Sequence, residues 1–129
     1  MMKEAVALAT ASVLLLLSAL HLYWAAGGEW GKGVTVPQRD GQPLFRPSKK
    51  ATIAVAVLLA LAAGIVVAGL KAGDWVLAFV FGLRAVGDCR WVGLLKRVRG
   101  TPFARLDTFV YSPLCLALCL GCLYMVVRR

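Results

Sequence analysis

Four long runs of apolar residues constrain this chain more than any other feature of its sequence. They cover about residues 5–26, 51–70, 75–92 and 108–127. Each is close to the roughly 20 residues that cross a ~30 Å hydrocarbon core as an α-helix. A helix also satisfies its backbone hydrogen bonds within one segment, as lipid requires. We therefore predict an all-α fold, a bundle of four transmembrane helices forming a single integral membrane domain over residues 1–129.

The composition excludes the common soluble classes. The chain is 60% hydrophobic and 16% charged, whereas soluble domains average roughly 45–50% and 25%. A soluble domain of this size cannot hide so much apolar surface, because small domains bury the smallest fraction of their surface. An ordinary cytosolic globular protein and a disordered basic tail are both excluded.

The connections between the runs differ in length and character. The first, residues 27–50, mixes five glycines with three prolines, and such a segment does not form a long regular element. The second, residues 71–74, is a tight turn. The third, residues 93–107, is basic and contains the helix-breaking Gly100-Thr101-Pro102. We expect Asp107 to cap the fourth helix and Pro113 to kink it unless the proline falls in the first turn.

The distribution of positive charge predicts the orientation in the membrane. Nine Lys and Arg residues lie in the two long connections: Lys32, Arg39, Arg46, Lys49, Lys50, Lys96, Arg97, Arg99 and Arg105. Only Lys3, Lys71, Arg128 and Arg129 lie on the opposite side. By the positive-inside rule we expect a multi-pass protein of the cell inner membrane with its termini outside. Because the basic residues alternate with apolar runs, we expect no nucleic-acid partner for this chain of net charge +9.

Charged residues in the third run mark a candidate site. Arg84, Asp88 and Arg90 lie inside or at the edge of the membrane, where a central charge costs on the order of 2.5–3.5 kcal/mol. Arg84 and Asp88 are four residues apart, so on a continuous helix they can form an ion pair. The structural alternatives are a buried pair that only fixes helix orientation, and a shorter helix with Asp88 and Arg90 at the interface.

Other polar side chains are expected in the same leaflet. The first and third runs are parallel in a four-helix topology, which places His21 and Trp24 beside the end of the third run. The fourth run begins there too and contributes Tyr111. The predicted ligand-binding set is His21, Trp24, Arg84, Asp88, Arg90 and Tyr111, with no catalytic residue. Because His21 is the only histidine, we predict no multi-histidine metal site, and no cofactor.

Two further patterns concern partners and thiols. Small residues at i, i+4 spacing in the second run permit a homo-oligomer, and they are Ala56, Ala60, Gly64 and Ala68. Cys119 and Cys122 form a C-x-x-C, but a quinone-reducing thiol enzyme needs a second cysteine pair, and only Cys89 lies near the other side. Cysteine is also an ordinary small apolar residue in buried helices.

Several stretches together resemble one family. They are residues 21–31 (HLYWAAGGEWG), 87–93 (GDCRWVG), 101–108 (TPFARLDT) and 111–115 (YSPLC). The family consists of small bacterial four-helix membrane proteins catalogued only as a domain of unknown function. The resemblance covers nearly the whole chain and implies a bacterial membrane protein without an assigned activity.

The function predicted from the sequence is that of a small binding or accessory membrane protein. Its polar site at the cytoplasmic leaflet would bind an anion, most economically the head group of an anionic membrane lipid, given the basic flanking connections. The sequence leaves two alternatives open. One is an oligomeric ion- or proton-coupled transporter, and the other is a membrane thiol oxidoreductase.

Overall fold

The computed structural model describes residues 1–129 and is all-α apart from short elements in one connection, which confirms the all-α part of the prediction. In chain order the elements are α1 (Met2–Ala25), η1 (Lys32–Val34), β1 (Gln38–Arg39), β2 (Gln42–Pro43), α2 (Lys49–Ala68), α3 (Lys71–Val86), α4 (Pro102–Leu106), η2 (Asp107–Tyr111) and α5 (Ser112–Arg128). Three helices are long and apolar enough to cross a membrane: Met2–Ala25, Lys49–Ala68 and the continuous Pro102–Arg128.

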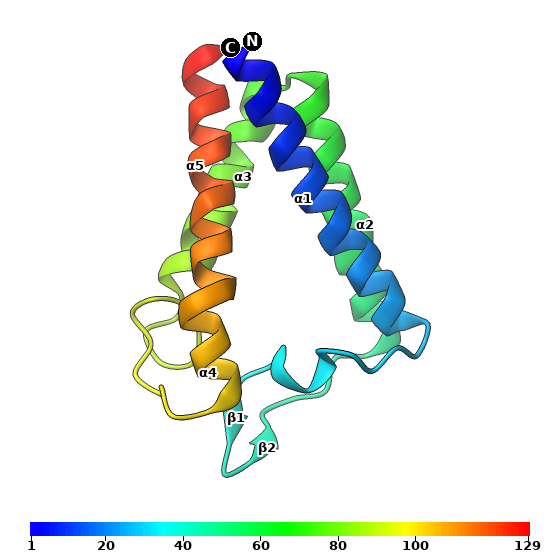
Figure 1. The fold of residues 1–129 in the computed structure, drawn as a ribbon, viewed down its shortest axis with the longest axis vertical. Helices are drawn as coiled ribbons and strands as arrows, with labels where there is room; N and C mark the ends of the chain where they lie inside the picture. The colour runs from blue at the N-terminus through cyan, green and yellow to red at the C-terminus, as the bar shows by residue number, and fades with distance from the viewer.

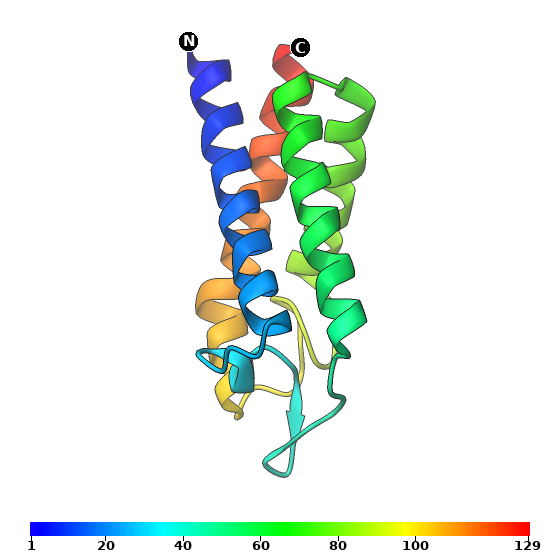
Figure 2. The ribbon, with the colours of Figure 1, turned by 90° about the vertical axis from the view of Figure 1, so that its right-hand side faces the viewer.

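The helices form two antiparallel pairs, α1 with α2 and α3 with α5. The pairs meet at the end that carries both termini and diverge toward the end that carries the two long connections (Figure 1). The view in Figure 2 likewise places both termini at one end and both long connections at the other. Both termini therefore lie at the end of the molecule opposite the two long connections.

Small residues let the pairs approach where they meet. A Cβ added to Gly121 of α5 would lie 2.7 Å from Oγ1 of Thr10, so α5 and α1 are in close contact there. Within the first pair, the Ser18 hydroxyl donates a hydrogen bond of 2.7 Å to the carbonyl oxygen of Ala56. The buried core joins all four helices through Ala11, Leu14, Ala62, Ala63, Val66, Ala78, Leu118 and Cys122. Close packing of this kind holds helices together in lipid.

Helix α3 is displaced toward the N-terminus relative to the prediction of 75–92. The expected turn at residues 71–74 is its first helical turn, because Gly69 already closes α2 in the left-handed conformation (φ 78°). Gly87 ends α3 with φ 87°, and a Cβ there would lie 1.8 Å from the carbonyl oxygen of Val92. Only glycine permits this reversal. Asp88 and Arg90 consequently lie outside the helix.

The last helix begins earlier than the predicted residue 108. Thr101 is its N-cap, accepting a hydrogen bond of 3.0 Å from the N–H of Ala104, and Pro102 occupies the first turn. Asp107 is therefore not an N-cap. Where a kink at Pro113 was expected, the helix is continuous and contains the π-helical stretch η2, in which the N–H of Ser112 bonds the carbonyl oxygen of Asp107. The wider turn accommodates a proline that has no N–H to donate.

The first connection, residues 26–48 in the structure, contains no long element, as predicted. Its regular features are the short η1 and the two-residue ladder of β1 and β2, whose strands are joined by Asp40 and Gly41 with positive φ. An Asp-Gly pair is typical of such tight hairpins. The connection runs from α1 across to α4 and returns to α2, so it spans the diverging end of the two pairs (Figure 1).

Candidate functional site

A cavity of about 670 Å³ lies where α1 ends and α2 begins, beneath the first connection. His21 and Trp24 line it from α1, and Val55 lines it from α2. Its volume is in the range of small-molecule sites. Three charged side chains of the first connection also line it, namely Glu29, Lys32 and Arg46.

The hydrogen bonding of His21 defines its role in this cavity. Its Nδ1 lies 2.7 Å from the carbonyl oxygen of Leu17. A carbonyl only accepts, so Nδ1 has to be the protonated nitrogen. In the neutral ring, Nε2 is then an acceptor with no partner in the chain. The ring packs edge-on against Trp24, with centroids 5.1 Å apart.

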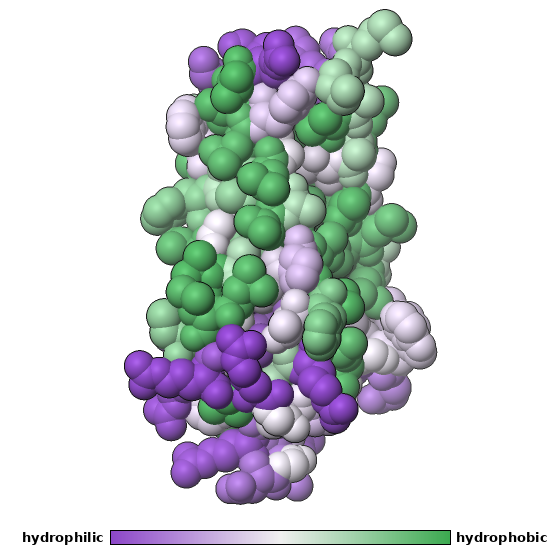
Figure 3. All heavy atoms as spheres, turned by 60° about the vertical axis from the view of Figure 1, so that its left-hand side comes forward, coloured by the Kyte–Doolittle hydropathy of each residue, from purple (hydrophilic) through white to green (hydrophobic).

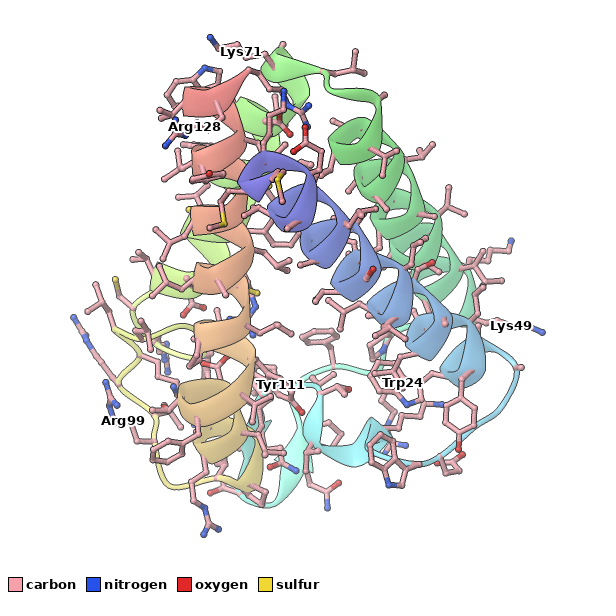
Figure 4. The ribbon with its side chains drawn as sticks, turned by 45° about the horizontal axis from the view of Figure 1, so that its top comes forward. Trp24, Lys49, Lys71, Arg99, Tyr111 and Arg128 are labelled. Carbon is pink, nitrogen blue, oxygen red and sulfur yellow. The ribbon has the colours of Figure 1, made fainter.

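Aromatic residues fix the start of the first connection against α1. The indole Nε1 of Trp24 donates a hydrogen bond of 2.8 Å to the carbonyl oxygen of Trp30, and the N–H of Trp30 donates one of 3.3 Å to the Tyr23 hydroxyl. Gly28 passes so close to the Tyr23 ring that a Cβ would lie 2.2 Å from it. The backbone beside Glu29 is thereby held at the edge of the cavity. Figure 4 shows Trp24 at this end of α1.

A buried charge cluster lies on the other helix pair. Nη2 of Arg84 is 2.7 Å from one oxygen of Asp107, and Nζ of Lys96 is 3.0 Å from the other. The predicted ion pair between Arg84 and Asp88 is therefore wrong, because α3 ends before Asp88. The side chains of Asp107 and Lys96 have no exposed surface. Gly93 donates its N–H to Asp107 at 2.7 Å, so the cluster ties α3, the third connection (residues 87–101) and η2 together.

Asp88 organises the turn that follows α3. Its Oδ1 accepts hydrogen bonds from the backbone N–H groups of Arg90, Trp91 and Val92, at 2.9, 2.7 and 3.2 Å. The N–H of Arg90, followed by that of Trp91, holds the pKa of the Asp88 carboxyl below its ordinary value of 3.8. The side chain of Arg90 is exposed and lies over the Trp91 ring, 5.0 Å from its centroid.

This arrangement predicts a local pH dependence. Because the folded-state pKa of Asp88 is lowered, its stabilising effect is complete above pH 3.8 and is lost as the pH falls through the folded value. We expect hydrogen-exchange protection of the Arg90 and Trp91 amides to fall in that acidic range. Asp88→Asn keeps a hydrogen-bond acceptor but cannot titrate. In this variant the same amides should be protected less than in wild type, and their protection should not change over the acidic range. Equal pH profiles for the two proteins would contradict this role.

Tyr111 joins the two halves of the molecule. Its hydroxyl donates a hydrogen bond of 2.8 Å to the carbonyl oxygen of Val34, and its ring packs against Phe103 at 5.8 Å between centroids. The first connection is thus attached to α1 through Trp30 and to η2 through Tyr111. In Figure 4 Tyr111 points from the last helix toward the first connection.

Loss of this hydrogen bond should loosen the first connection. We expect Tyr111→Phe to cost about 1 kcal/mol and to raise tryptic cleavage after the exposed Arg39 about fivefold, since cleavage follows the population of the open segment. Tyr124→Phe, at the opposite end of the molecule, is the matched control and should cleave at the wild-type rate. Equal rates for all three proteins would show that the bond does not hold the connection.

Two of the six predicted site residues thus line the cavity, and the other four lie on or beside the second helix pair. Sequence reasoning did not place Lys96 or Asp107 in a polar cluster, nor Lys32, Arg46 and Glu29 at the cavity. All four cysteines are free, and no three His, Cys, Asp or Glu side chains are grouped to hold a metal ion.

The chain is all-α and has three helices long and apolar enough to cross a membrane. The buried charge cluster and the cavity both lie toward the end that carries the long connections. A family model described as "Protein of unknown function (DUF3995)" matches residues 14–122. The protein therefore belongs to this family, and the resemblance seen in the sequence is confirmed. No curated protein and no solved structure matches the chain.

Proposed function

We propose that the protein is a bacterial, multi-pass inner-membrane protein whose four helices form a transmembrane bundle. Large apolar side chains on the outer faces support this, including Leu16, Val67 and Phe79, which are 71%, 63% and 67% exposed. In Figure 3 hydrophobic residues occupy the middle of the face shown, and hydrophilic residues gather at its two ends. Helix α3, at 16 residues, spans only about 24 Å and would need local thinning of the bilayer or help from flanking residues.

The basic end would face the cytoplasm. The Lys and Arg residues of the two long connections lie at the end opposite the termini, and most of them are exposed. This asymmetry favours termini on the outer side. A cysteine-accessibility assay with single-cysteine variants at Ser48 and Arg128 would determine the orientation, since we expect a membrane-impermeant reagent to label only the latter in intact cells.

The protein would bind an amphiphile with a phosphate-containing head group in the cavity described above. The observation that carries this is the lining, in which the cations Lys32 and Arg46 adjoin the apolar Phe45 and Val55. Cations bind phosphate, and apolar side chains accept the hydrocarbon next to it. Arg84, which the sequence suggested for this role, is already engaged by Asp107. Arg84, Asp88 and Tyr111 then act by holding the helices and connections in place.

Native mass spectrometry of the protein extracted gently from its own membrane tests this function. We expect wild type to retain lipid, and Lys32→Glu with Arg46→Glu to lose it. Lys49→Glu with Lys50→Glu is the matched control, because it reverses the same charge on exposed residues that do not line the cavity. Figure 4 shows Lys49 pointing away from the molecule. Wild type without lipid, or equal loss in both variants, would overturn the proposal.

The same spectra report the oligomeric state. Ala56 is buried within the chain, whereas Ala60, Gly64 and Ala68 are exposed and could still approach a second copy. If these three residues join copies of the chain, the spectra must contain a dimer or a larger oligomer. The alternative function of an oligomeric transporter makes the same requirement. We expect Gly64→Leu to dissociate such a species, and a monomeric wild type would remove this alternative.

A further inference from the structure

The charges around the cavity are of both signs, and none is neutralised within the chain. Glu29, Lys32 and Arg46 all line it, yet none takes part in any of the four ion pairs of the molecule. A ligand with only negative charge would satisfy the two cations and would be repelled by Glu29. A ligand with both charges would satisfy all three groups.

The acceptor side of the cavity is specific in its chemistry. Glu29 supplies a carboxylate, and Nε2 of His21 is an acceptor without a partner in the neutral form of the ring, because Nδ1–H donates to the carbonyl oxygen of Leu17. Trp24 adds an aromatic ring, which attracts a cation over its face. A primary ammonium donates three hydrogen bonds to such acceptors, and a trimethylammonium donates none.

Resting on the proposed function, we infer that the cavity binds the phosphate ester of a primary amino alcohol, as in an ethanolamine phospholipid. Lys32 and Arg46 contact its phosphate, and Glu29 with His21 receives its ammonium group. The charged residues belong to the first connection, whose attachment to α1 and η2 holds them over the apolar part of the cavity.

The test measures lipid selectivity of the whole protein in nanodiscs that contain equal amounts of ethanolamine, glycerol and choline phospholipids of one acyl composition. Lipids retained after gentle release are counted by native mass spectrometry. We expect the ethanolamine lipid to be enriched about fivefold over the other two, which is the effect of one ion pair of about 1 kcal/mol. Equal retention of ethanolamine and glycerol lipids would overturn the inference and leave the proposed function standing. If the wild-type protein retained none of the three lipids, both the inference and the proposed function would be overturned.

Glu29→Gln gives the sharper comparison. Its loss of charge should abolish the preference for the ethanolamine lipid, so that the ethanolamine and glycerol lipids are retained in equal amounts. Asp40→Asn is the matched control, since it removes the same charge from the same connection outside the cavity, and asparagine tolerates the positive φ of 54° there. An unchanged preference in Glu29→Gln, or the same change in Asp40→Asn, would overturn the inference.

A water-soluble competitor distinguishes the two possible sources of this head group, a membrane lipid and a soluble phosphate ester. Protein released from its own membrane is incubated with glycerophosphoethanolamine or glycerophosphoglycerol at one concentration. A retained mass with acyl chains identifies a lipid, and a retained mass without them identifies the soluble ester. Stronger displacement by the ethanolamine ester supports the inferred head-group chemistry for either source, and equal displacement contradicts it.

Discussion

Asp107→Asn should lower the apparent melting temperature of the detergent-solubilised protein by more than about 10 °C. The wild-type carboxylate contacts Arg84 at 2.7 Å and Lys96 at 3.0 Å, and its side chain has no exposed surface. Without it two cations remain side by side, one of them fully buried. Breaking a buried ion pair from one side costs about 3–5 kcal/mol, which corresponds to a shift of this size in a chain of 129 residues.

Asparagine makes this substitution informative because it keeps the shape and can still accept the N–H of Gly93. Asp88→Asn is the control, since it removes the same charge from an exposed carboxylate in the adjacent turn. We expect that control to melt within a few degrees of wild type, because a surface contact contributes little. If both variants melted alike, the charge cluster would not be what joins α3, the third connection and η2.

The number and order of the helices were predictable because long apolar runs have few other ways to satisfy their backbone in lipid. Four consecutive runs that alternate in direction place both termini at the same end, as in the structure. The third helix was extended too far, to residue 92, because the apolar Cys89, Trp91 and Val92 were included in the run although the chain turns at Gly87. Gly87 and Gly93, which contact each other at the base of the turn, were the signal that could have ended the helix at Val86.

The partners of the charged residues were not predictable in the same way. Spacing of i, i+4 pairs Arg84 with Asp88 only if the helix runs through both, and Asp107 is 23 residues from Arg84 in sequence. Its contact depends on how α3 packs against the last helix. Thr101-Pro102, an N-cap followed by a proline, was the better start signal and would have left Asp107 free for another role.

The residues that line the cavity could likewise not all be predicted from the periodicity of the sequence. His21 and Trp24 were found because they lie at the end of a helix whose face can be read from the sequence. Lys32 and Arg46 come from a connection rich in glycine and proline, whose path is set by its contacts with Trp24 and Tyr111. Loop residues of this kind need the folded structure to be placed.

Arg129→Met should destabilise the opposite end of the molecule by a comparable amount, about 3–5 kcal/mol. Nε of Arg129 lies 2.5 Å from Oδ2 of Asp74, whose side chain is fully buried in the first turn of α3. Nη2 of Arg129 also donates to the carbonyl oxygen of Val66 near the end of α2. One guanidinium thus joins the end of α5 to the α2–α3 hairpin, and its removal leaves a buried carboxylate without a counter-charge.

Arg128→Met is the matched control, because Arg128 carries the same charge, is exposed, and lies over the Tyr124 ring, 5.5 Å from its centroid, without a part in any of the four ion pairs. We expect Arg128→Met to melt near wild type and Arg129→Met to melt more than about 10 °C lower. Asp74→Asn added to Arg129→Met should restore part of the loss, since the uncompensated charge and not the missing side chain is its main cause. A double variant no more stable than Arg129→Met would assign the loss to the contact with Val66 instead.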